Sequence, residues 1–312
     1  MKHRLPILIM IAFFALGLFP KIALGTNNAP RVVASITPFQ TLIASLMEGI
    51  ASKPQLLVKN GGSPHDYSLR PSDLKLLKEA DIIFWAGPNL ESFLIKPLNT
   101  IVEKQKPIII QLDKTPGLLL LPTRNSTGEQ HEHAEGDNCT HALIDMHFWL
   151  DPNNAILLTD LMAKTLSNFD PLHANIYKQN ANRFKIQLKA LDSKIVMELK
   201  EVKATPFIVF HDAYQYFEHH YGLKGVGAIT LNPEVPPSVK RLRFIRQTIE
   251  KTKAHCVFSE PQFQPKLVQS IVQDLPIKTG ELDPLGKGNS SSNGYFVLLE
   301  NLADSLKSCL KQ

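Results

Sequence analysis

The sequence lacks an apolar run long enough to span a membrane. Its longest run, Leu5–Phe19, is interrupted by a proline and a glycine and is shorter than the roughly 20 residues of a membrane-spanning helix. Basic residues at positions 2–4 precede the run, and Ala23-Leu24-Gly25 follows it. This order is typical of a secretory signal peptide. We therefore expect residues 1–25 to be a cleaved leader, with an uncleaved anchor as the alternative.

The sequence also lacks a strong excess of charge of either sign. Its 34 Lys and Arg residues stand against 29 Asp and Glu residues, a formal net charge of +5. Loss of the leader would remove three of the positive charges, at Lys2, Arg4 and Lys21. Domains that bind nucleic acid generally carry a strongly basic surface, so we expect no nucleic-acid partner.

Two functional features are absent as well. No cysteine follows the apolar run before Cys139, so the chain offers no site for the lipid attachment that would tether an exported protein to a membrane. A freely diffusing exported protein, as in a periplasm, is therefore predicted. The sequence also has no His-Glu-x-x-His motif, which supplies two metal ligands and a general base in many zinc hydrolases. We do not expect an enzyme.

Only three cysteines are present. An oxidising compartment would allow one of the possible pairs to form. Cys256 lies in a predicted strand and Cys309 in the last turn of a predicted helix, both in the C-terminal part of the chain, so we pair Cys256 with Cys309. Cys139 then remains as a free loop thiol or a soft metal ligand.

Strand and helix patterns alternate along both halves of the chain. Its 312 residues exceed the usual size of one domain, and the alternation predicts two α/β lobes with parallel sheets. The expected strands of the first half are 31–35, 55–58, 81–86 and 107–112, and its expected helices are 38–48, 71–79, 91–103 and 153–167. The second half repeats the pattern with strands 207–210, 225–228, 256–259 and 277–279 and helices 213–221, 238–251, 265–273 and 294–310.

A polar tract at residues 124–142 interrupts the first half. It contains His131, His133 and His141 among acidic residues and has few aliphatic side chains. Such a composition cannot build a core, so we expect a loop.

A long helical pattern separates the two halves. It opens at Asp170-Pro171 and continues to about Lys203, which would make a helix roughly 50 Å long. We therefore predict a rigid connecting helix at 169–204, between an N-terminal lobe at 26–168 and a C-terminal lobe at 205–312.

Three histidines lie far apart in the sequence, each beside a turn or the end of a strand. His65 follows the strand 55–58 through a Gly-Gly-Ser-Pro loop, His147 precedes Phe-Trp-Leu-Asp-Pro, and His211 follows the strand 207–210 directly. Open α/β sheets bind ligands at the carboxyl ends of their strands, and neutral imidazole is a common zinc ligand. We therefore predict that His65, His147 and His211 bind Zn(II) in the cleft between the lobes. A structural role is the alternative for each one alone, most of all for His147, which could pack as an aromatic beside its neighbours.

A fourth ligand would complete a tetrahedral zinc site. Asp283 comes shortly after the strand 277–279, so we predict it as this ligand, although an Asp before a proline could equally cap a turn. Glu281, Asp66 and a water are the substitutes. We also expect Glu281 or Asp66 to orient ligand imidazoles by accepting hydrogen bonds from their N–H groups.

Four further histidines receive structural roles in this interpretation. They lie on predicted helix faces, beside a helix cap or before a strand: His173, His219, His220 and His255. Adjacent residues do not share a helix face, as a metal-binding pair would require, so His219 and His220 are not such a pair.

Five segments of the chain together resemble a known family. They are Gly-Gly-Ser-Pro-His65-Asp-Tyr, His147-Phe-Trp-Leu-Asp-Pro, Phe-His211-Asp-Ala-Tyr, Glu260-Pro-Gln-Phe and Leu282-Asp-Pro-Leu-Gly. In combination they resemble the ZnuA-type zinc-binding components of bacterial ABC importers, over nearly the whole mature chain. Manganese-binding relatives commonly carry glutamate in place of the third histidine, so His211 favours the zinc branch.

The resemblance implies two α/β lobes joined by one long helix, metal held between them, a histidine- and acid-rich loop near the site and a disulfide in the second lobe. It implies a fourth ligand that is a carboxylate or solvent. The implied function is capture of Zn(II) in the periplasm and delivery to an ABC permease, by a protein that we expect to be a monomer. The alternatives are a manganese receptor or adhesin of the same fold and, from another class, a secreted zinc hydrolase.

Overall fold

The computed structural model describes residues 29–59, 62–102, 107–124, 144–230, 233, 235–263 and 266–311. The predicted leader at 1–25 lies outside the described residues, and so does nearly all of the tract at 124–142, including its three histidines and Cys139. Within the described ranges, no helix combines the length and the apolar character needed to cross a bilayer.

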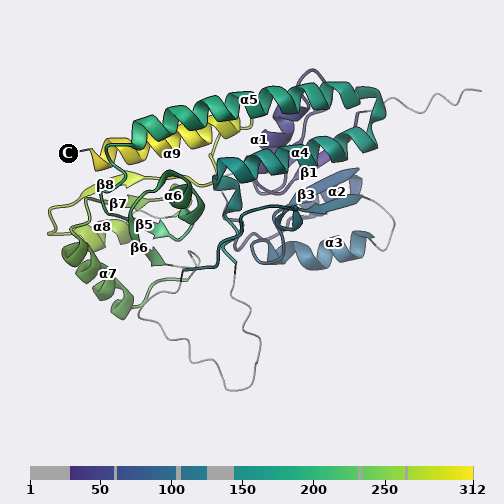
Figure 1. Cartoon of the computed structure of the whole chain (residues 1–312). Coiled ribbons are helices and arrows are strands. Elements are labelled where there is room, and N and C mark those ends of the chain that lie inside the picture. The colour runs from purple at the N-terminus through teal and green to yellow at the C-terminus, as the bar shows by residue number, and fades with distance from the viewer. Residues whose placement is uncertain are drawn as a thin grey trace, which may run out of the picture.

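The first lobe contains a four-stranded parallel sheet with the order β2-β1-β3-β4 (Figure 1). Runs of β-branched and aromatic residues form the two central strands, which are buried on both faces, as parallel strands between helices must be. The elements are β1 (Val32–Ala34), α1 (Thr37–Leu46), β2 (Gln55–Leu56), α2 (Pro71–Glu79), β3 (Ile82–Trp85), α3 (Ile95–Val102) and β4 (Ile108–Gln111).

The second lobe repeats this arrangement with the strand order β6-β5-β7-β8, again all parallel. In each sheet the second strand in sequence lies on one side of the first, and the third strand lies on its other side. Such a switch point opens a ligand-binding crevice at the carboxyl ends of the strands. The elements are β5 (Phe207–His211), α6 (Gln215–Tyr221), β6 (Gly225–Thr230), α7 (Val239–Thr252), β7 (Cys256–Ser259), α8 (Lys266–Val272), β8 (Lys278–Glu281) and α9 (Gly294–Leu310). Two parallel sheets confirm the predicted fold class.

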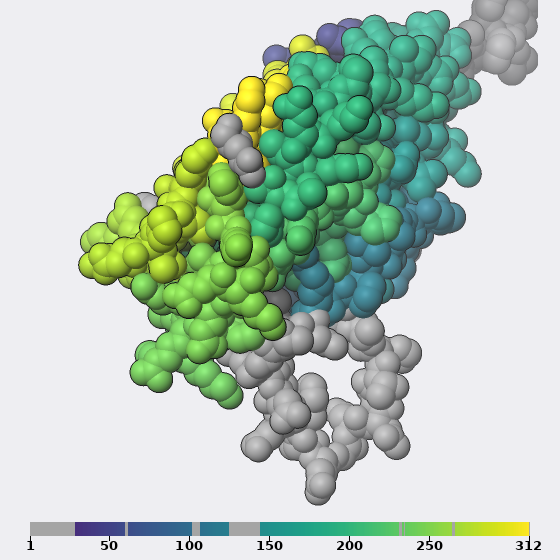
Figure 2. Space-filling view, turned by 60° about the vertical axis from the view of Figure 1, so that its left-hand side comes forward, coloured from purple at the N-terminus to yellow at the C-terminus, as the bar shows by residue number. Residues whose placement is uncertain are grey.

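Two long helices lie between the two sheets in sequence and across both lobes in space. Helix α4 (Pro152–Phe169) ends the first lobe, and α5 (Ala174–Leu199) then runs back along α4, α1 and α9. Figure 1 shows α5 spanning the length of the molecule, and in Figure 2 the teal surface of α4 and α5 lies between the blue first lobe and the green and yellow second lobe. The 26 residues of α5 correspond to roughly 39 Å.

The connecting helix is therefore shorter than predicted at both ends. Before it, the Asp170 carboxylate accepts hydrogen bonds from His173 Nδ1 (2.6 Å) and Tyr177 Oη (2.9 Å) and closes a 3-10 turn. After it, the N–H groups of Val202 and Lys203 both bond to the Leu199 carbonyl, and the chain continues in turns. A 3-10 turn held by side-chain hydrogen bonds at one end and backbone turns at the other thus limit a sequence pattern that is helical throughout.

A single hydrophobic core runs through both lobes. It contains Phe39 of α1, Trp149 before α4, Phe184 of α5 and Tyr295 of α9, all almost fully buried. Two smaller cores cover the outer faces of the two sheets. Because the central core has no boundary between the lobes, rotation of one lobe against the other would expose apolar surface, which is costly.

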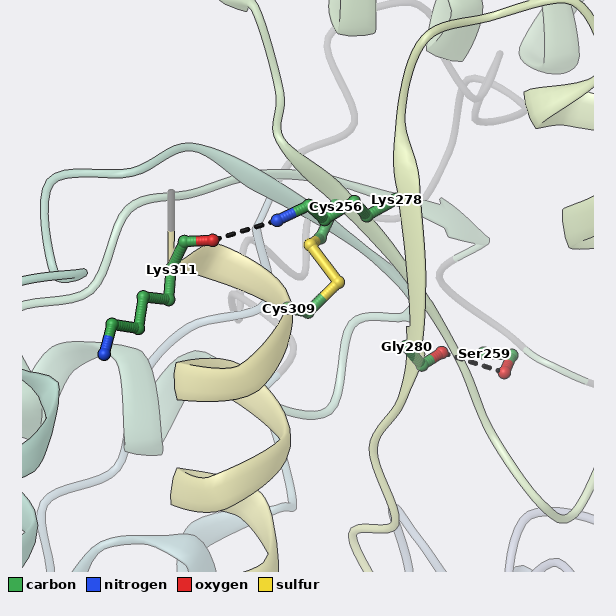
Figure 3. The surroundings of a disulfide bond; sticks show 6 residues. All are labelled: Cys256, Ser259, Lys278, Gly280, Cys309 and Lys311. Carbon is green, nitrogen blue, oxygen red and sulfur yellow. Dashed lines mark hydrogen bonds between the residues drawn. A yellow bond between two sulfur atoms is a disulfide. The ribbon is translucent and has the colours of Figure 1, made fainter.

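A disulfide joins Cys256 of β7 to Cys309 in the last turn of α9, as predicted (Figure 3). The two residues are 53 positions apart, so the bond closes a loop of about half of the second lobe. Next to it, Lys278 Nζ donates a hydrogen bond to the Lys311 carbonyl (2.9 Å), and Ser259 Oγ donates one to the Gly280 carbonyl (3.1 Å). The first bond ties the edge strand β8 to the residue that follows α9, and the second joins β7 to β8.

Candidate metal centre

His65 reaches the centre from the loop that follows β2. Its backbone N–H donates to Ser63 Oγ (3.2 Å), and Pro64 before it is buried. The ring is only partly buried as a whole, yet its Nε2 is sheltered and has no hydrogen-bond partner among the described residues. A sheltered nitrogen without a partner is unusual and fits a lone pair that is kept for a ligand.

His147 stands at the start of a 3-10 turn, Phe148–Leu150, which leads into α4. Asp145 accepts hydrogen bonds from both the backbone N–H (3.0 Å) and Nδ1 (2.7 Å) of His147. The Asp145 carbonyl in turn accepts a hydrogen bond from Tyr216 of the second lobe (2.6 Å). A short local motif therefore fixes the ring and directs Nε2 towards the pocket.

His211 is the last residue of β5, beside the switch point of the second sheet. Glu260 follows the neighbouring strand β7 and accepts hydrogen bonds from the backbone N–H (3.2 Å) and Nδ1 (2.6 Å) of His211. The two histidines thus have the same arrangement, in which a carboxylate holds the Nδ1–H group and directs Nε2 towards the pocket. This pairing is typical of histidines that bind metal.

The three rings converge on one small pocket. Their ligand atoms all lie within 4.8 Å of one another, and theirs is the one such group found among the described residues. His147 Nε2 and His211 Nε2 are 3.2 Å apart, close to the roughly 3.3 Å between two nitrogens bound to a tetrahedral zinc ion. Ser63, Pro64, Phe263, Pro284 and Leu285 line much of the remaining wall. The arrangement can hold one four-coordinate metal ion.

The charges around the pocket suit a divalent cation. Asp145 and Glu260 are both buried, and together their two negative charges balance an ion of charge 2+. Burial lowers the pKa of His211, but the charge of Glu260 and its hydrogen bond outweigh it, so this pKa is raised. The pKa of His65 is lowered well below its usual value by burial and then by His147 and His211, which keeps this ring neutral and ready to bind.

Comparison with known proteins agrees with this geometry. Residues 32–309 match the family profile described as "ZnuA: Zinc-uptake complex component A periplasmic". The chain belongs to the ZnuA family.

Its relatives include proteins named "High-affinity zinc uptake system protein ZnuA". The one from Brucella suis biovar 1 is 42% identical over 309 residues, covering 90% of this chain and 92% of the relative. The one from Yersinia pestis is 38% identical over 296 residues, covering 90% and 91%.

Solved structures share the fold. One titled "Crystal structure of ZnuA" has a TM-score of 0.77 at 23% identity and covers 91% of this chain and 100% of the other. A mutant of the laminin-binding adhesin Lmb from Streptococcus agalactiae has a TM-score of 0.76 at 23% identity, covering 90% and 100%.

In this ZnuA family member, Asp283 lies behind Gln262, a residue of the pocket lining, and does not line the pocket itself. Its Oδ1 accepts hydrogen bonds from Gln262 Nε2 (2.7 Å) and the Leu285 N–H (2.9 Å), and its Oδ2 accepts one from the Lys287 N–H (2.6 Å). In the part of the chain that the structure describes, Asp283 belongs neither to the pocket lining nor to the histidine group. It caps the turn after β8.

The acids that orient the histidines differ from those expected. Glu281 and Asp66 are both exposed, whereas Asp145 and Glu260 make the hydrogen bonds to the ligand rings. Asp145 stands two residues before His147, so its closeness in sequence could have identified it as the partner of that ring. Glu260 stands 49 residues after His211, and only the pairing of β5 with β7 brings the two together.

Two histidines to which we assigned structural roles lie outside the three-histidine pocket. His173 binds Asp170 at the turn before α5. His220 lies between Asp192 (2.8 Å) and Asp151 (3.5 Å), where it joins α6 to α5 and to the start of α4.

Proposed function

We propose that this chain is a periplasmic zinc receptor, which captures Zn(II) with His65, His147 and His211 and delivers it to an ABC-type membrane permease. The observation that carries the proposal is the convergence of three histidine nitrogens within 4.8 Å. The relatives named as high-affinity zinc uptake proteins support it. We include export in the proposal, with residues 1–25 as the cleaved leader.

A water completes the zinc shell in this proposal. Asp283, the other candidate, already accepts three hydrogen bonds through its two oxygens, and turning it towards the metal would leave those donors without partners. Such a loss costs free energy, up to about 1–3 kcal/mol where the donor is buried. Three nitrogens and one water then form the tetrahedral set that zinc prefers.

The nitrogen-rich ligand set favours zinc over manganese. Manganese(II) prefers more ligands and more oxygen among them, and the described pocket presents three imidazoles to the ion. A manganese receptor or an adhesin is the second candidate, because structural relatives include a Pseudomonas aeruginosa protein in complex with Mn²⁺ and the laminin-binding adhesin of Streptococcus agalactiae. Titration with Mn(II) alone separates these functions, since a manganese receptor must bind Mn(II) tightly, whereas a site of three imidazoles and a water should bind it weakly.

Release of the ion would proceed by local movement in the loops that carry the ligands. The shared core and α5 oppose a large rotation of the lobes, and His65 lies on a loop rather than on a strand or helix. Crystal structures with and without zinc should therefore superpose over both sheets and differ around residue 65. A wide rigid-lobe rotation between them would contradict this.

Metal analysis of the purified mature chain tests the proposal directly. The native protein should contain one tightly bound zinc in the pocket, and a variant with His65, His147 and His211 all replaced by alanine should lose it. A matched control replaces His173, His219 and His255 by alanine, which removes the same number of imidazoles outside the site. Equal zinc content in the two triple variants would refute the assigned site, and hydrolysis of ester, peptide or lactam substrates by the zinc-loaded protein would favour an enzyme.

A further inference from the structure

Gln262 occupies the wall between the metal pocket and a larger neighbouring cleft. It stands two residues after Glu260, in the turn that follows β7, and it lines both cavities. Its Nε2 donates a hydrogen bond to Asp283 Oδ1 (2.7 Å). Its Oε1 is buried and has no hydrogen-bond partner among the described residues.

The Asp283 carboxylate determines which way the Gln262 amide faces. Backbone N–H groups of Leu285 and Lys287 hold both of its oxygens in place, so the carboxylate cannot turn away. A carboxylate only accepts hydrogen bonds, whereas an amide has one donating and one accepting end. The nitrogen of Gln262 must therefore face Asp283, and the oxygen must face the opposite side.

The burial of Oε1 indicates which cavity it faces. The larger cleft has a volume of about 400 Å³, and an oxygen on its side would be in contact with solvent. The sheltered Oε1 fits the small pocket that contains the three histidines. A buried carbonyl oxygen without a partner costs about 1–3 kcal/mol, which a ligand in the pocket would offset by donating a hydrogen bond.

We propose that Gln262 is a positioning residue for the metal-bound water: its Oε1 accepts a hydrogen bond from the water that occupies the fourth position on zinc. This inference rests on the proposed function. Zinc polarises its bound water and makes it a strong donor. A neutral amide holds that water without adding charge, which matters because Asp145 and Glu260 already balance the ion. Asp283 would then act on the metal through Gln262 instead of binding it.

The test replaces Gln262 by leucine, which has a similar volume but no acceptor. We expect zinc affinity to fall about tenfold, the lower end of the range for outer-shell partners. We also expect a change in the d–d absorption of the cobalt(II)-loaded protein, because the fourth ligand moves. Asp283→Asn should change the same spectrum to a smaller extent, because an asparagine at 283 lets the Gln262 amide face either way.

Gln40→Leu is the matched control. Gln40 of α1 is also buried, donates from Nε2 to the Pro54 carbonyl (3.2 Å) and has an Oε1 without a partner among the described residues, but it does not line the metal pocket. This variant should lose thermal stability and keep the native zinc affinity and cobalt spectrum. Native affinity and spectrum in Gln262→Leu would overturn the inference. A native protein that binds no zinc would instead overturn the proposed function, and the inference with it.

Discussion

The two lobes present their histidines to the pocket in different ways. The second lobe supplies His211 from the end of a buried strand, and a carboxylate from the neighbouring strand fixes it. The first lobe supplies His147 from a turn and His65 from a loop, and of these two only His147 has a carboxylate partner among the described residues. The pocket therefore has a preformed side, made of His147 and His211, and a less constrained side at His65.

We therefore expect the three ligands to contribute differently to the affinity and to the rates of zinc binding. His147 and His211 are already at the spacing that a zinc ion needs, so they should determine affinity. His65 is the most exposed of the three and should determine how fast the ion enters and leaves.

The largest expected effect comes from comparing His211→Ala with His65→Ala. Sharing the roughly 10–16 kcal/mol of a four-ligand zinc site among its ligands gives about 2.5–4 kcal/mol for each, so His211→Ala should weaken binding roughly a hundred- to a thousandfold. Because His211 belongs to the preformed side of the pocket, the loss of affinity should exceed that in His65→Ala. Competition with a chromophoric chelator measures affinity, and stopped-flow release into excess chelator measures dissociation. Identical losses of zinc affinity in the two variants would contradict the distinction between a preformed and a less constrained side of the pocket.

Removal of the disulfide should destabilise the second lobe without changing the site. The loop between Cys256 and Cys309 spans 53 residues, for which the entropy of loop closure gives about 4 kcal/mol. Replacing both cysteines by alanine should lower the free energy of unfolding by an amount of this order, as measured by urea denaturation of the zinc-free protein. Zinc affinity should stay within about twofold. A large fall in affinity would show that the disulfide also positions His211.

A smaller effect is expected when the carboxylates lose their charge. Asp145→Asn and Glu260→Gln should each weaken zinc binding 10- to 100-fold, or about 1.4–2.7 kcal/mol, because the ligand rings become less basic and less firmly oriented. Asp170→Asn is the matched control, since Asp170 binds His173 in the same manner outside the site. Titration calorimetry on the three variants would decide, and a similar loss in the control would contradict the assigned roles.

The smallest expected effect is a shift in the pH dependence of zinc affinity, which should differ between His211 of the second lobe and His65 of the first. Because the pKa of His211 is raised, its ring keeps a proton up to a higher pH than an ordinary histidine, and zinc must displace that proton. Below this raised pKa, affinity should fall about tenfold per pH unit. Glu260→Gln removes the charge that raises the pKa, so the fall should begin at lower pH. Since the pKa of His65 is already lowered, His65→Ala should leave the onset of the fall unchanged.

Much of this architecture could be predicted from the sequence, because local patterns determine it. Alternating strand and helix patterns specify two parallel sheets, and the carboxyl ends of strands are where ligands bind, so His65 and His211 could be found before the structure. Glu260 could not be recognised as the partner of His211, because that contact depends on which strands pair. The place of Asp283 depended on two backbone N–H groups in a turn, which no spacing rule indicates.

The core that passes without a break from one sheet to the other has a consequence for how the molecule folds. Separating the two halves would expose this core to water, so we expect unfolding to be one cooperative transition for the whole polypeptide. A fragment containing His65 and His147 would therefore not retain half of the affinity; separated from its counterpart, it would have no ordered metal site at all.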